Sequence, residues 1–214
     1  MLVLFGLGRP GSGKSTAARR ITSLVQKIGW NTTRIKDYEI LYEWFLADTT
    51  QNRFRPADYS GFDVLDFSVL DEVLVEVQRQ TLKRKSSVTE NELVIIEFAR
   101  DDYGEALQRF DPGLLKDAYF LFIEAEVETC IQRIHERIKE PDRFDNHFIS
   151  DEIVRGYYGK DNIPYMKQGI QEDFGIEHQR VKAVYNNGSK EQFVLEVDQF
   201  IESILPGTLT AASK

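Results

Sequence analysis

The chain has 214 residues, of which 42% are hydrophobic and 29% charged, as expected for a globular protein that buries a sizeable core. Its formal charge of −8 at pH 7 excludes a broad basic surface, so we expect no nucleic acid among its partners. The single cysteine, Cys130, excludes an internal disulfide framework and favours a reduced, cytoplasmic setting. The longest apolar runs, residues 1–7 and 93–98, are too short to span a bilayer, so no membrane segment is expected.

The apolar pattern predicts strands that alternate with helices along the chain. Residues 1–7 form a continuous apolar run, typical of a strand buried on both faces, and residues 14–28 carry apolar positions at helical spacing. Further strands are predicted at 31–36, 92–98, 118–123 and 180–185, and further helices at 38–47, 64–85, 105–110, 127–138, from 150 onward, and 190–204. Residues 53–63 are interpreted as a loop and 206–214 as a disordered tail. The alternation predicts an α/β fold in three α/β/α layers, with a five-stranded parallel sheet and one domain over residues 1–205.

A phosphate-binding motif lies between the first predicted strand and the first predicted helix. Gly8, Gly13, Lys14 and Ser15 satisfy the pattern GxxxxGK[ST]. The glycines allow phosphate oxygens to approach backbone N–H groups, Lys14 places an ammonium on the β and γ phosphates, and Ser15 offers a hydroxyl to magnesium. The alternative is a glycine-rich turn that matches by chance, which the position between a buried strand and a helix disfavours. The motif therefore predicts binding of a nucleoside triphosphate with Mg²⁺.

Polar residues follow two of the predicted strands at the sheet edge where ligands bind in such folds. Glu97 closes the strand at 92–98, where its carboxylate would hold magnesium through water or accept a proton from an attacking hydroxyl. Arg100 lies near the same edge of the predicted sheet and is a candidate to bind the substrate, as is Asp37 at the end of the second strand. In the alternative interpretation Glu97 is merely the first polar residue after a core strand, paired with Arg100.

Three arginines follow the fourth predicted strand. Arg133 and Arg137 are four residues apart on one helix face, and Arg143 follows in a polar segment. Mobile arginines that close over a transferring phosphoryl group stabilise its charge and exclude water, so these residues are candidates for a lid. The alternative is a solvated helix with internal ion pairs, for instance between Arg133 and Glu136.

These motifs resemble those of the nucleoside and nucleotide kinases. The stretch GRPGSGKST, residues 8–16, is similar to the GxPGxGKxT loop of adenylate kinase and related monophosphate kinases. Glu97 to Arg100 stand where thymidylate kinases have an Asp-Arg-Tyr motif and deoxynucleoside kinases a Glu-Arg-Ser motif, although two residues separate the acid from the arginine here. Residues 186–189, after the last strand, resemble a loop that packs beside the nucleotide base in that family.

The resemblance implies a P-loop NTPase fold with a helical lid over about residues 133–149, and ATP and Mg²⁺ as cofactors. The residues that it places at the nucleotide are Gly8, Gly11, Ser12, Gly13, Lys14, Ser15, Thr16 and Asn187. Glu97 would be the base or a magnesium partner beside Ser15, and Arg133, Arg137 and Arg143 would form the lid. Asp37 and Arg100 would contact the substrate.

Together these features predict an ATP- and Mg²⁺-dependent kinase that moves the γ-phosphate to a small-molecule acceptor, such as a nucleoside or nucleoside monophosphate. The alternatives are a partner-regulated P-loop ATPase and a non-catalytic nucleotide-binding protein. The guanine-reading NKxD pattern is absent, which disfavours a GTPase switch but leaves GTP open as a donor. The sequence also leaves open the identity of the acceptor and whether the chain forms a homodimer.

Overall fold

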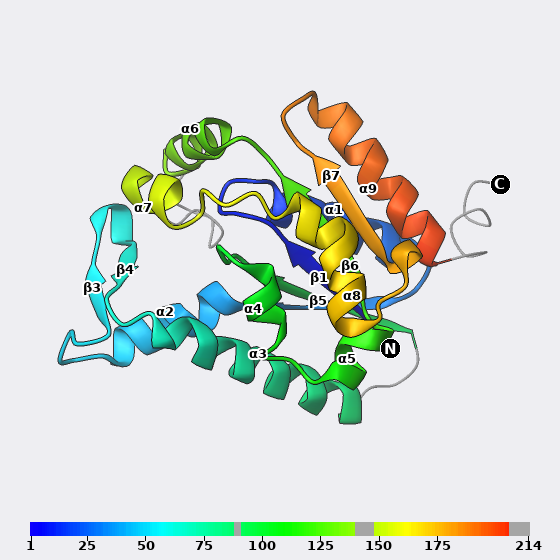
Figure 1. Cartoon of the computed structure of the whole chain (residues 1–214), viewed down its shortest axis with the longest axis horizontal. Coiled ribbons are helices and arrows are strands. Elements are labelled where there is room, and N and C mark those ends of the chain that lie inside the picture. The colour runs from blue at the N-terminus through cyan, green and yellow to red at the C-terminus, as the bar shows by residue number, and fades with distance from the viewer. Residues whose placement is uncertain (88–90, 140–147, 206–214) are drawn as a thin grey trace.

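The computed structural model describes residues 1–87, 91–139 and 148–205, and its centre is a five-stranded parallel sheet (Figure 1). The strands are β1 Leu2–Leu7, β2 Asn31–Lys36, β5 Glu92–Phe98, β6 Tyr119–Glu124 and β7 Val181–Tyr185. They lie in the order β2-β5-β1-β6-β7, so β1 is central and is paired in parallel with β5 and β6. Each strand lies within one residue of its predicted bounds, which confirms the predicted sheet.

The strands are apolar on both faces because helices cover both faces of the sheet. All seven residues of β5 are buried. Val94, Ile96 and Phe98 point into one hydrophobic core, whereas Leu93 and Ile95 point into a second core on the opposite face. This alternation confirms the predicted three-layer architecture.

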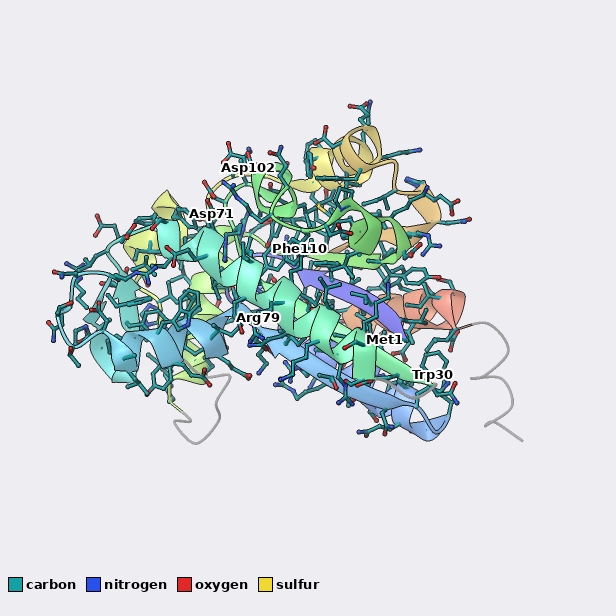
Figure 2. All side chains as sticks on the ribbon, turned by 90° about the horizontal axis from the view of Figure 1, so that it is seen from below. Met1, Trp30, Asp71, Arg79, Asp102 and Phe110 are labelled. Atoms are coloured by element: carbon teal, nitrogen blue, oxygen red, sulfur yellow. The ribbon has the colours of Figure 1, made fainter. Side chains whose placement is uncertain are left out.

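Nine α-helices within the described residues surround the sheet. They are α1 Lys14–Lys27, α2 Asp37–Ala47, α3 Ser68–Ser87, α4 Tyr103–Leu107, α5 Pro112–Asp117, α6 Val127–Arg137, α7 Asp151–Gly156, α8 Ile170–Phe174 and α9 Lys190–Ile204. Short 3₁₀ helices lie at Asp58–Ser60 and His178–Arg180, and a short π-helix lies at Tyr165–Gly169. Helices α1 and α9 pack on one face, and α3 crosses the other, as Figure 2 shows from below. Within the described residues, no helix combines the length and apolar character that crossing a membrane would require.

The prediction of a plain loop over residues 53–63 is wrong. Strands β3 Phe54–Pro56 and β4 Phe62–Val64 form a short antiparallel ribbon there. The ribbon is anchored on α2 by Phe62, whose ring centroid lies 5.2 Å from that of Phe45 and 5.4 Å from that of Tyr38. Strands of three residues are too short to produce a recognisable alternation, and their aromatic packing is non-local.

Several helix boundaries also differ from the sequence prediction; α4, for instance, spans Tyr103–Leu107 and not residues 105–110. Helix α3 begins at Ser68 and not at residue 64, because β4 includes Val64. Pro112, which follows the helix predicted at 105–110, is the first residue of α5, a helix that was not predicted, and the Asp111 side chain caps that helix by accepting a hydrogen bond from Leu114 N at 3.1 Å. Proline suits the first helical position because its nitrogen needs no hydrogen-bond partner there.

Phe5, at the centre of β1, provides a test of the core. Its side chain is fully buried, stacked on Phe120 with ring centroids 5.0 Å apart and edge-to-face on Phe110 at 5.1 Å. We expect Phe5→Ala to lower the free energy of unfolding by about 3–5 kcal/mol, measured by denaturant titration, because it leaves a cavity in the core. The control Val75→Ala, on a side chain that is 54% exposed on α3, should change it by less than about 0.5 kcal/mol. Similar small losses in both variants would contradict the central role of Phe5.

Candidate active site

The phosphate loop, residues 8–13, connects β1 to α1 (Figure 1) and lies against three other segments of the chain. Gly8, Gly11 and Gly13 have φ values of 138°, 80° and 114°, which residues with a side chain rarely adopt. A Cβ atom at these positions would lie 2.2 Å from a carbonyl oxygen of β6, 2.5 Å from a carbonyl oxygen of α6 and 2.5 Å from the Asn186 side-chain nitrogen, respectively. The three glycines are therefore required by packing as well as by the approach of phosphate.

The side chain of Lys14, the first residue of α1, contacts the beginning of the loop. Its Nζ donates hydrogen bonds to the backbone oxygens of Gly8 at 2.6 Å and Arg9 at 3.0 Å. Burial lowers the pKa of Lys14 to about 8, an effect that the nearby carboxylates of Asp37 and Glu97 partly offset. The ammonium is thus positioned by loop carbonyls and lies close to the carboxylates at two strand ends.

Ser15 and Glu97, predicted as the magnesium pair, lie side by side. Ser15 Oγ donates to Glu97 Oε2 at 3.3 Å, and the Glu97 side chain is only 4% exposed. The second carboxylate oxygen, Oε1, accepts from Arg34 Nε at 2.7 Å. Because the arginine fixes one oxygen, the other is held towards the serine hydroxyl.

Asp37 and Arg100, predicted as substrate contacts, form a buried ion pair with each other. Arg100 Nη1 lies 2.6 Å from Asp37 Oδ2, and Arg100 Nη2 donates to the backbone oxygen of Leu70 at 2.6 Å. Both residues also line the main cavity. The alternative that Arg100 pairs with Glu97 is not what the structure has, since Glu97 pairs with Arg34.

The candidate lid arginines are only partly placed by the structure. Arg133 Nη2 donates to Asn186 O at 2.8 Å, which connects α6 to the loop after β7, and its Nη1 approaches Gly11 O at 3.5 Å. Arg133 and Arg137 both line the main cavity. Arg143, with most of the segment between α6 and α7, lies outside the described residues.

The loop after β7 contacts the phosphate loop through Asn186. The Asn186 Nδ2 donates to Ser12 O at 2.7 Å, whereas the Oδ1 of Asn187 accepts from the backbone nitrogen of Glu126 at 2.8 Å. Thr16 lines the cavity, but the Ser12 side chain is fully buried. Ser12 and Asn187 are not among the residues that line the cavity, whereas Asn186 is.

Sequence reasoning missed three residues that shape the site. Arg34 holds Glu97, and it could have been found because residue 34 lies on the strand that pairs with β5. Tyr103 is buried, and its hydroxyl accepts a hydrogen bond from Gly8 N at 2.7 Å. Arg9 is buried beside Glu124. Its position as a charged residue within the glycine-rich loop could have indicated from the sequence that it has a role at the site.

A cavity of about 1010 Å³ connects these residues. At one end it is lined by Gly13, Lys14, Ser15, Thr16, Asn186 and Phe193, and at the other by Asp37, Tyr38, Phe62, Phe67, Tyr157 and Tyr158. Pockets for single small ligands span about 300–1,000 Å³, so this cavity has room for a nucleotide and a second small molecule.

The comparisons with known proteins agree with this description. No family model matches the chain, and no curated protein matches it in sequence. Among solved structures, Kti12 from Chaetomium thermophilum in complex with ADP-AlF3 aligns over 97% of this chain and 99% of its own, with a TM-score of 0.54 and 13% identity. A gluconokinase from Sinorhizobium meliloti 1021 aligns over 100% and 97%, with a TM-score of 0.50 and 14% identity. A sugar kinase from Janibacter sp. HTCC2649 aligns over 100% and 99%, with a TM-score of 0.50 and 12% identity.

Identities this low establish the fold and nothing finer. The five-stranded parallel sheet, the phosphate loop after its central strand and these similarities together define a P-loop NTPase fold. The P-loop NTPase fold that the sequence resemblance implied is therefore confirmed, whereas the lid, of which residues 140–147 lie outside the described residues, stays a prediction.

Lys14 yields a prediction about stability and pH. Its pKa falls from 10.5 unfolded to about 8 folded, so between these values the unfolded chain binds more protons and stability should rise with pH. At neutral pH the buried ammonium costs up to about 3 kcal/mol, and we expect Lys14→Met to recover part of that free energy while weakening nucleotide binding. Denaturant titrations at about pH 7 and pH 9 test this, because the variant should lose the rise in stability that Lys14 contributes, and the buried tyrosines, whose pKa values burial raises, titrate only at higher pH.

Lys27→Met, on an exposed lysine near the end of α1, is the matched control and should keep the pH dependence of the wild-type chain. A Lys14→Met variant that is less stable than wild type at neutral pH would contradict the prediction.

Proposed function

We propose that this protein is an ATP- and Mg²⁺-dependent kinase that transfers the γ-phosphate to a small-molecule acceptor. The observation that supports this best is the shared cavity, which has the phosphate loop at one end and the Asp37–Arg100 pair with aromatic side chains at the other. An ATPase needs only the first end, whereas a kinase must hold an acceptor beside the γ-phosphate.

The donor end has ligands that suit magnesium. Mg²⁺ prefers hard oxygen ligands and keeps several waters, and the Ser15 hydroxyl and Glu97 carboxylate provide such oxygens next to Lys14. Ser15 would hold the ion directly and Glu97 through water. When bound, the ion neutralises charge that develops on the phosphate oxygens. Lys14 would add its positive charge at the β and γ phosphates.

The acceptor end has a carboxylate that suits proton transfer. For a hydroxyl acceptor, the hydroxyl oxygen attacks the γ-phosphorus, the bond to the β–γ bridging oxygen breaks, and the hydroxyl proton passes to a base; a nucleoside monophosphate would attack through an ionised phosphate oxygen and would need no base. Asp37 is the better candidate because both oxygens of Glu97 already face Arg34 and Ser15. Arg100 holds Asp37 in place at the edge of the cavity.

The walls of the acceptor end favour a flat molecule. Tyr38, Phe62, Phe67, Tyr157 and Tyr158 line it, and aromatic side chains bind ring systems by stacking and edge contacts. A nucleoside or nucleoside monophosphate fits this description. The similarities to a gluconokinase and a sugar kinase add gluconate and hexoses to the compounds worth testing.

A transfer assay tests the proposal. The protein is incubated with Mg²⁺ and γ-labelled ATP against nucleosides, nucleoside monophosphates, gluconate and hexoses, and both labelled acceptor and free phosphate are measured. We expect label on one class of acceptor. Rapid release of free phosphate with no labelled acceptor would instead support the alternative of a partner-regulated ATPase.

Substitutions of Glu97 and of Asp37 should affect different steps, magnesium binding in the first case and phosphoryl transfer in the second. We expect Glu97→Gln to weaken the apparent affinity for Mg²⁺ by about 10- to 100-fold, because it disturbs a group that orients the metal's ligands. We expect Asp37→Asn to lower kcat by about 10²–10⁴-fold while Mg·ATP affinity is retained.

Magnesium titrations and steady-state kinetics separate these effects, and thermal unfolding checks that each variant is folded. If Glu97→Gln abolishes turnover with an unchanged magnesium dependence, Glu97 is the base and the assignment is reversed.

A further inference from the structure

Arg9 is a charged residue inside the phosphate loop, yet its side chain is only 7% exposed and turns away from the cavity lining. Its guanidinium makes three contacts with other parts of the chain. Nη2 lies 2.9 Å from Glu124 Oε1 at the end of β6 and 3.0 Å from the backbone oxygen of Lys160, and Nη1 donates to the backbone oxygen of Ala125 at 3.0 Å. A buried arginine with partners on two separate segments fixes the backbone that carries it.

That backbone in turn positions Lys14. The carbonyl oxygen of Arg9 accepts hydrogen bonds from Lys14 Nζ at 3.0 Å and from the backbone nitrogen of Ser12 at 3.1 Å. The preceding residue, Gly8, is held from the other side by the Tyr103 hydroxyl. The first turn of the loop is therefore held by side chains that do not themselves line the cavity.

We infer that Arg9 is a positioning residue, which through its ion pair with Glu124 holds the first turn of the phosphate loop in the conformation that binds the triphosphate. The inference rests on the proposed binding of Mg·ATP at this loop. It assigns a role to a buried arginine and a partly buried glutamate that the phosphate-binding motif does not specify. Arg9 acts through Lys14 and the loop backbone and does not contact the nucleotide.

The charge of Glu124 makes this role measurable. Burial raises the pKa of Glu124 to about 7, which the charge of Arg9 opposes and that of Asp161 reinforces. Other titratable or charged groups near this pair are the Cys130 thiol, whose pKa burial raises to about 11, Lys14 and Arg133, which both act on that thiol, and Tyr185, the register partner of Glu124 on β7. Below about pH 7 Glu124 gains a proton and its ion pair with Arg9 is lost, so the hold on the loop should weaken.

The test is the affinity for Mg·ATP, measured by calorimetry between about pH 6 and pH 8 on the full chain. We expect wild-type affinity to fall by about three- to tenfold as the pH drops through this range. Glu124→Gln keeps the shape but cannot titrate, so its affinity should keep only the pH dependence that the ligand and Lys14, whose pKa lies near 8, contribute. Glu126→Gln, on an exposed carboxylate two residues away, should behave as wild type.

Substitution of the arginine provides a second readout. Arg9→Met should weaken Mg·ATP binding at every pH and remove the same pH dependence, whereas Arg9→Lys, which keeps the charge, should restore part of both. Thermal unfolding at each pH identifies any variant that fails to fold, in which case Glu124→Gln alone decides.

The outcomes distinguish this inference from the proposed function. An unchanged pH profile in Glu124→Gln, or wild-type affinity in a folded Arg9→Met, would overturn the role of Arg9 while Mg·ATP binding stands. A wild-type chain that binds no Mg·ATP at any pH would overturn the proposed function itself.

Discussion

The rest of the site depends on how tightly the phosphate loop is packed. Gly8, Gly11 and Gly13 lie against β6, α6 and the Asn186 side chain with no room for a Cβ atom. The loop is therefore shaped by the sheet and helices before any ligand arrives, and its backbone can present fixed carbonyl and amide groups. This preorganisation places Lys14 beside the strand ends, where the acidic side chains lie.

Three carboxylates near this loop, two of them buried and one partly buried, share one arrangement. Glu97 at the end of β5, Asp37 at the start of α2 and Glu124 at the end of β6 each pair with a different arginine. A buried carboxylate is costly unless it is paired, and a planar guanidinium also fixes its orientation. Each arginine thus allows a carboxylate to remain, in a fixed orientation, where water has little access. The carboxylates near Lys14 thus pair with arginines and not directly with the Lys14 ammonium.

Local patterns predicted the parts of the molecule that depend on neighbours in sequence. The five strands and the phosphate loop were predicted because long apolar runs and a glycine motif are local signals. The ribbon at Phe54 and Phe62 was missed, because its stability comes from rings on α2. Glu97 and Asp37 do lie at the ends of neighbouring strands, but their ion-pair partners were not predicted: the choice of Arg34 for Glu97, and of Arg100 for Asp37, is made by strand pairing and not by spacing.

The contact between Arg9 and the carbonyl oxygen of Lys160 has an evolutionary consequence. Every amino acid has a main-chain carbonyl, so the side chain at position 160 can change without loss of this bond. The two tyrosines that line the acceptor end, Tyr157 and Tyr158, lie only a few residues earlier in the same segment. Relatives could therefore vary this wall of the cavity to suit other acceptors while the segment stays tied to the phosphate loop. In such relatives the arginine at position 9 would be kept, whereas the residue at position 160 would vary.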